Sequence, residues 1–93
     1  MRIHVSLLVN RKQDIIPGIA RKFHISESQA VKFLMLAVEE LARSKKLTVM
    51  DGEIIGGDEE VGSLIREVEG WTEDEFDEED FEIIGYCRSI ADG

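Results

Sequence analysis

The sequence predicts a small α+β fold that is mostly α, with one N-terminal strand, several helices and one hairpin. Polar and apolar residues alternate from Arg2 to Leu7, which is typical of a half-buried strand. Apolar residues recur at three- and four-residue spacing over residues 30–41 and 61–68, as in helices packed on a core. The chain has 93 residues, of which 43% are hydrophobic, so we expect one small domain with an appendage.

Two helices are predicted in the N-terminal half, over residues 15–23 and 26–44. Asp14 is expected to cap the first helix, and Pro17 falls in its first turn, where proline is tolerated. Ser26 and Gln29 have the spacing of a capping box, so the second helix begins there. Its apolar stripe is too wide for one strand and one short helix to cover, and a lone strand leaves its edge unpaired. The sequence therefore predicts an obligate homodimer.

The C-terminal half is predicted to begin with a small hairpin, because Asp51-Gly52 favours a two-residue turn. A helix is expected from Asp58 to Gly70. Thr72 and Glu75 have the spacing of another capping box. The following run, residues 73–82, contains eight acids in ten positions, and a last helical turn or two is expected after it.

The net charge of −9 is divided unevenly along the chain. Residues 1–46 carry nine basic and four acidic groups, whereas residues 47–93 carry two basic and sixteen acidic groups, so the halves have charges of +5 and −14. This asymmetry predicts a module over residues 1–46 that faces an anion such as phosphate. Residues 47–93 are expected to be an acidic extension that faces a basic partner or the basic half itself.

Catalysis, cofactors and membrane insertion are not expected. The only cysteine, Cys87, has no disulfide partner, which predicts a reducing, cytoplasmic setting. Two histidines and one cysteine are too few for a zinc site or a nucleophilic triad. No phosphate-binding glycine motif or calcium loop is present, and no apolar run approaches the length of a membrane span.

The junction between the two N-terminal helices reads Ile25-Ser26-Glu27-Ser28-Gln29-Ala30-Val31-Lys32, and it resembles the ribbon-helix-helix superfamily of DNA-binding proteins, of the Arc and MetJ type. In that family a glycine is followed by an aliphatic residue, Ser, any residue, Ser, Glu or Gln, a small or aliphatic residue, an aliphatic residue, and Arg or Lys. The resemblance covers about residues 2–45. The family's glycine is His24 here, and Glu27 stands where a phosphate would approach.

The resemblance implies a homodimer whose N-terminal strands pair into an intermolecular antiparallel ribbon that enters the major groove of double-stranded DNA. The outward residues of the ribbon would contact bases: Arg2, His4 and Ser6. The start of the second helix and nearby basic residues would contact phosphates: Arg11, Lys12, Arg21, Lys22, Ser26, Ser28 and Lys32. The dimer core would contain Ile3, Val5, Leu7, Val31, Leu34, Met35, Val38 and Leu41.

The leading functional prediction is a sequence-specific transcriptional regulator, a repressor of the antitoxin or the phage and plasmid type. Its acidic segment would bind a basic protein through Glu73, Asp74, Phe76, Asp77, Asp80 and Phe81. The alternative function is an inhibitor whose acidic half mimics nucleic acid and whose N-terminal module serves only as a dimer platform. A third hypothesis has the acidic half folding back on the basic half as a brake. An ordinary helix-turn-helix is the alternative fold, because Ala20 and the Ile25-Ser26 turn also suit it.

Overall fold

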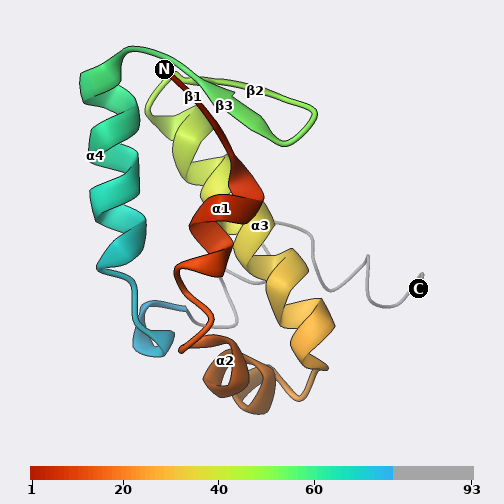
Figure 1. The fold of residues 1–93 in the computed structure, drawn as a ribbon. Coiled ribbons are helices and arrows are strands. Elements are labelled where there is room, and N and C mark those ends of the chain that lie inside the picture. Colours follow the sequence, from red (N-terminus) through yellow and green to blue (C-terminus); the bar gives the residue numbers. More distant parts are fainter. Residues whose placement is uncertain (77–93) are drawn as a thin grey trace.

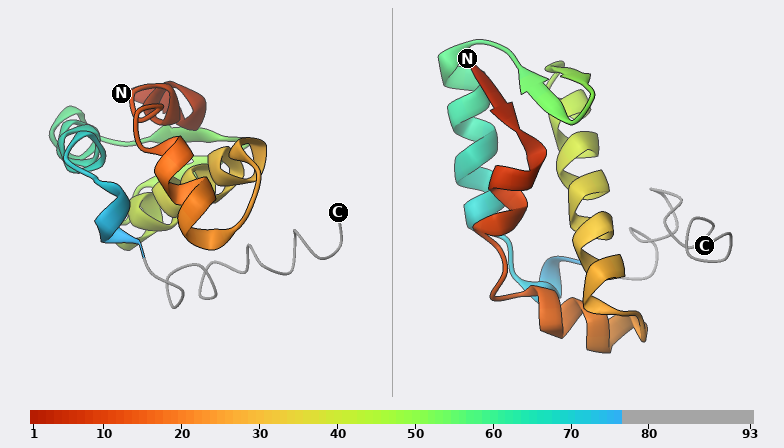
Figure 2. Two further views of the ribbon diagram at one scale, coloured as in Figure 1. Left: turned by 90° about the horizontal axis from the view of Figure 1, so that it is seen from below. Right: turned by 45° about the vertical axis from the view of Figure 1, so that its right-hand side comes forward.

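A computed structural model describes residues 1–76 and has the predicted class, a mostly helical α+β fold with a short antiparallel sheet (Figure 1). The elements, in chain order, are β1 (Arg2–His4), α1 (Val5–Asn10), α2 (Ile16–Phe23), α3 (Glu27–Ser44), β2 (Thr48–Met50), β3 (Glu53–Ile55), α4 (Asp58–Glu69) and the 3₁₀ turn η1 (Glu73–Glu75). The long helix α3 runs from α2 at one end to the sheet at the other (Figures 1 and 2).

The three strands form one sheet in the order β1-β3-β2, with both pairs antiparallel. Ile54 is the fully buried centre of the sheet, and it lies opposite Ile3 on β1 and Val49 on β2. The predicted hairpin is confirmed. Asp51 and Gly52 have φ angles of 51° and 80°, the two positive values that a two-residue turn of this kind requires.

The prediction of a strand through Leu7 is wrong, because the strand ends at His4 and α1 begins at Val5. Val5, Leu8 and Val9 are buried, and their spacing fits a helix better than the alternation fits a strand. Leu7 faces solvent with 53% of its surface exposed. Ser6 therefore does not share a strand face with Arg2.

β1 pairs with β3 of its own chain and forms one edge of the sheet, so the predicted intermolecular ribbon stays a prediction. The backbone amide of Val5 continues the pairing by donating to the carbonyl oxygen of Gly52 at 2.8 Å. One edge of β1 is thus paired within the chain, by residues about fifty positions away. The homodimer itself stays a prediction.

The two predicted N-terminal helices are confirmed within one residue at their starts. Pro17 lies in the first turn of α2 as expected, but Ile15 is the N-cap and no side chain caps this helix, so the role predicted for Asp14 is wrong. The capping box of α3 is present, with both Ser26 and Gln29 bonded as predicted. Local side-chain chemistry therefore fixes the start of α3 but not that of α2.

The core crosses the predicted boundary at residue 46. One buried cluster joins α1 and α3 to the hairpin and α4: it contains Val5, Leu8, Val38, Ala42, Leu47, Ile54, Val61, Leu64 and Val68. The predicted helix from Asp58 to Gly70 is confirmed as α4, and α4 packs on α1 and α3. Because both halves supply this cluster, they share one structural unit over the described residues.

A second buried cluster surrounds α2 and the first half of α3: it contains Val9, Ile15, Ile16, Ile19, Ala20, Ala30, Phe33, Leu34 and Phe76. Phe76 is only 5% exposed, so its ring is part of the core and is not at the surface where partner binding was predicted. Thr72 makes no capping bond, and only a 3₁₀ turn follows it, contrary to the predicted capping box. The predicted contacts Asp77, Asp80 and Phe81, and the last helical turns, lie outside the described residues.

Among residues 1–76, no helix combines the length and the apolar character that crossing a bilayer requires.

Replacing Leu64 by Ala is expected to lower the free energy of unfolding by about 2–5 kcal/mol, because Leu64 is fully buried between α4 and its neighbours. Leu7→Ala removes the same atoms from an exposed site and should change the free energy of unfolding by less than about 0.5 kcal/mol. Urea denaturation measures both. A loss at Leu7 as large as that at Leu64 would contradict this assignment and place Leu7 in an interface.

Candidate nucleic-acid interface

α2 and α3 are joined by a three-residue turn over residues 24–26. His24 ends α2 with φ 56° and ψ 46°, the left-handed conformation that glycine adopts most readily. The amide of Ile25 then donates to the carbonyl oxygen of Ala20 at 2.9 Å, which closes the end of the helix. His24 therefore takes up a backbone conformation that favours glycine, at the position where the family that the sequence resembles has glycine.

The start of α3 is held by the capping box. The amide of Gln29 donates to Ser26 Oγ at 3.1 Å, and the amide of Ser26 donates to Gln29 Oε1 at 3.0 Å. These bonds satisfy one free amide at the start of α3 and one just before it. The turn is consequently fixed at both ends, by a left-handed residue and by a capping box.

Small side chains let α2 and α3 approach closely. Ala20 on α2 and Ala30 on α3 are both buried, with Ile19 and Phe33 beside them in the same cluster. These two helices and the short turn between them are called here the helix-turn-helix unit, a name that describes only their order in the chain. The alternative fold, an ordinary helix-turn-helix, stays a prediction.

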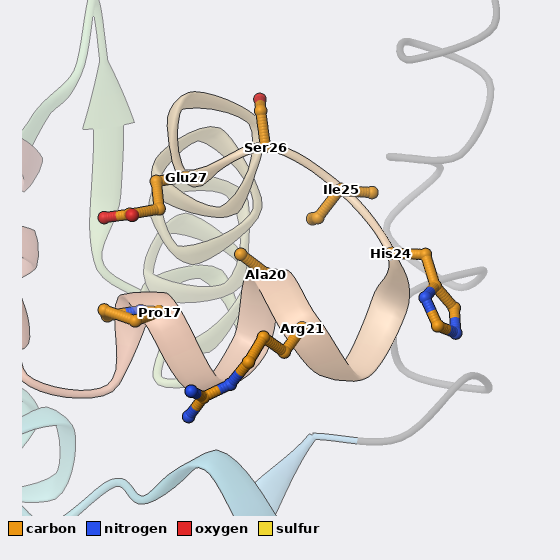
Figure 3. A pocket seen from close by; sticks show the side chains of 7 residues that line it. All are labelled: Pro17, Ala20, Arg21, His24, Ile25, Ser26 and Glu27. Atoms are coloured by element: carbon orange, nitrogen blue, oxygen red, sulfur yellow. The ribbon is translucent and has the colours of Figure 1, made fainter.

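The outer side of this unit is a shallow hollow shown in Figure 3 and lined by Pro17, Ala20, Arg21, His24, Ile25, Ser26 and Glu27. In that view the side chains of Pro17 and Arg21 extend from α2, whereas Ser26 and Glu27 extend from the start of α3. Hydroxyl, carboxylate and guanidinium groups thus lie on one side of the helix pair.

Four of the seven predicted phosphate contacts lie on this unit and are exposed: Arg21, Ser26, Ser28 and Lys32. Ser28 and Lys32 are one turn apart on α3, so they share a face of the helix. Within residues 1–76, no ion pair engages Arg21 or Lys32. Both cations are therefore available to an anion from outside the chain.

The other three predicted phosphate contacts are engaged by the C-terminal half. Arg11 Nη1 lies 3.0 Å from Glu69 Oε2. Lys12 is only 7% exposed, and its Nζ donates to the carbonyl oxygen of Glu69 at 3.1 Å. Lys22 Nζ donates to the carbonyl oxygens of Glu73, at 3.3 Å, and of Phe76. The structure uses these cations to attach α4 and η1 to the N-terminal half.

The predicted base contacts lie elsewhere. Arg2 is on β1, where its Nε is 3.0 Å from Glu53 Oε2. His4 caps α1: its Nδ1 accepts from the amide of Ser6 at 3.2 Å and lies 2.8 Å from Ser6 Oγ. Both residues are at the sheet, the opposite end of α3 from the turn (Figure 1). They do not adjoin the helix-turn-helix unit.

Most residues predicted for a dimer core pack within the chain. Val5, Leu34 and Val38 are buried, and partly buried side chains pack beside them: Ile3, Val31, Met35 and Leu41. Leu7 is the one exposed member of the set. Within the described residues, a single chain thus covers most of the apolar side chains whose burial had predicted a second copy.

Glu27 is not among the contacts that the sequence predicts, although it is exposed in the first turn of α3 beside Ser28. A carboxylate here complements the positive end of the helix dipole, and carboxylates in general can accept hydrogen bonds from amino groups such as that of cytosine. Its place in the capping-box run could have identified it as a first-turn residue. No cluster of three metal-ligating side chains occurs among the residues that the structure describes.

Comparisons with protein-family models, with curated proteins and with solved structures found no match for this chain.

Replacing His24 by Gly is expected to raise the free energy of unfolding by about 1 kcal/mol, because a residue with a Cβ is strained in the left-handed region and this side chain is exposed. His24→Val is the matched control and should lower the free energy of unfolding, since β-branched residues tolerate the left-handed conformation least. Thermal unfolding followed by circular dichroism distinguishes the two. A loss of stability in His24→Gly would show that the imidazole itself holds the turn.

Proposed function

We propose that the chain binds double-stranded DNA through the α2–α3 unit and acts as a transcriptional regulator. The observation that carries the proposal is the exposed start of α3, where Ser28 and Lys32 share a helix face and the preceding Ser26 and Glu27 line the same hollow as Arg21 of α2. In helix-turn-helix proteins the N-terminal residues of the second helix contact base edges, and the first helix crosses the phosphate backbone.

The side chains at this position have suitable chemistry. Lys32 donates to guanine, the hydroxyl of Ser28 donates and accepts, and Glu27 accepts from cytosine. Arg21 on the adjoining helix is a phosphate contact with two parallel donors. The base contacts of the proposal are therefore assigned to the start of α3 in place of Arg2, His4 and Ser6.

The homodimer is kept as part of this proposal, because two copies would read two half-sites about one helical turn apart. Met1 and Met50 each expose more than half of their surface, and an interface would cover such side chains. Repression follows as the simplest effect of a bound dimer at a promoter. A basic protein that binds the acidic C-terminal residues belongs to the antitoxin version of the proposal.

The second candidate function is the acidic inhibitor that mimics nucleic acid. It is favoured by Glu73, Asp74 and Glu75, which expose three carboxylates in one turn. This function depends on those carboxylates and is indifferent to Arg21 and Lys32, so substitutions separate it from DNA binding.

The double variant Arg21→Gln/Lys32→Gln is expected to bind duplex DNA at least about tenfold more weakly and, because Arg21 is the phosphate contact of the pair, to reduce the slope of log affinity against log salt by about 1. The matched control Arg66→Gln/Lys46→Gln removes the same charge from exposed cations away from the α2–α3 turn, and it should retain most of the affinity. Fluorescence anisotropy of duplexes selected from a random pool measures both.

Equal losses of DNA affinity in the two double variants would show that binding depends only on net charge. That result would contradict the assignment of the contacts to α3. Failure of the full-length protein to bind any duplex at low or physiological salt would overturn the DNA-binding proposal. Capture of a basic protein that is lost on neutralising Glu73, Asp74 and Glu75 would then establish the inhibitor.

A further inference from the structure

Residues 71–76, here called the acidic strap, are anchored to the helix-turn-helix unit by aromatic packing. The ring of Phe76 lies edge-to-face against Phe33 of α3, with 5.3 Å between centroids, and it meets Trp71 at the same separation. Phe33 in turn packs on Phe23, the last residue of α2, at 5.6 Å. Four rings thus connect the strap to both helices of the unit (Figure 2 shows η1 beside α2).

The polar attachment of the strap leaves its charges free. Lys22 of α2 donates to two backbone carbonyl oxygens of the strap, those of Glu73 and Phe76. The carboxylates of Glu73, Asp74 and Glu75 form no ion pair within the described part of the chain. The ammonium group that fixes the strap therefore pairs with its backbone, and three exposed negative charges are held next to α2.

One of these charges lies directly on α2. A Cβ atom added to Gly18, in the first turn of the helix, would collide with the carboxylate of Glu73. Gly18 is buried even though its neighbour Pro17 is exposed, because the strap covers this side of the helix. Arg21 follows Gly18 by three residues on α2, so the two lie close together on the helix surface. A phosphate that approaches Arg21 consequently meets a carboxylate already placed on α2.

We propose that the acidic strap is an intramolecular electrostatic mask, which places carboxylates where the DNA backbone would run along α2 and thereby weakens DNA binding. This inference rests on the proposed function and adds a regulation to it. Charges separated by less than the Debye length of about 8–10 Å interact at physiological salt, so carboxylates on α2 oppose the phosphates that Arg21 attracts.

The test is the variant Glu73→Gln/Asp74→Asn/Glu75→Gln in the full chain, measured by anisotropy on the same selected duplexes at low salt. The anchors of the strap are the Phe76 ring and two backbone carbonyls, so the substitutions leave them in place. We expect DNA to be bound about tenfold more tightly than by the unaltered protein. Circular dichroism verifies the fold, and Glu73→Gln alone gives a smaller gain if the triple variant unfolds.

The matched control is Asp51→Asn/Glu59→Gln/Glu60→Gln, which removes three negative charges from the hairpin turn and the start of α4, at the other end of the molecule (Figure 1). A gain confined to the strap variant supports the mask. Equal gains in both variants, or none in the strap variant while Arg21→Gln/Lys32→Gln loses affinity, overturn the mask and leave DNA binding intact. Absence of binding in every variant overturns the proposed function and the mask with it.

Discussion

The wide apolar stripe of α3 is the constraint that the other elements satisfy. Eighteen residues long, this helix buries Phe33 and Leu34 near its start and Val38 and Ala42 further along. No single neighbour covers that length. α2 and Phe76 cover the first half, α1 crosses the middle, and α4 with the hairpin covers the rest. The surplus apolar surface that predicted a second copy is largely covered by the chain's own later residues.

The predictable parts of the fold are those determined by neighbours in sequence. The capping box at Ser26, the turn at Asp51-Gly52 and the limits of α4 follow from local backbone chemistry, and all are present. The strand through Leu7 was wrong because Val5 belongs to both an alternating and a helical pattern, and only burial against α3 decides between them. The pairing of β1 with β3 depends on residues fifty positions apart, for which a single sequence carries no signal.

The residues of the candidate site also fall into two groups, those that local sequence identifies and those whose state depends on the tertiary structure. Ser28 and Lys32 were identifiable because they stand in the short junction, residues 25–32, that resembles the ribbon-helix-helix family, and Arg21 is one of the basic residues just before it. Lys12 and Lys22 read as equally free cations in the sequence, and only the tertiary structure shows that each is bonded to a carbonyl of the C-terminal half. Phe76 connects the core with the candidate site, because its carbonyl oxygen accepts from Lys22 and its ring is buried. Its ring completes the core beside Phe33, so the carboxylates that precede it cannot leave α2 without uncovering that core.

The bonds from Lys12 to Glu69 and from Lys22 to Phe76 span 57 and 54 positions, and the sheet joins the first residues to the fifties. Contacts of such long range form late in folding, because a large loop must close before they contribute. During synthesis the basic half emerges first and has no partner for its apolar surface until α4 has left the ribosome. The N-terminal helices complete their burial only when α4 and Phe76 pack on them, so the arrangement that buries their apolar faces includes the acidic strap.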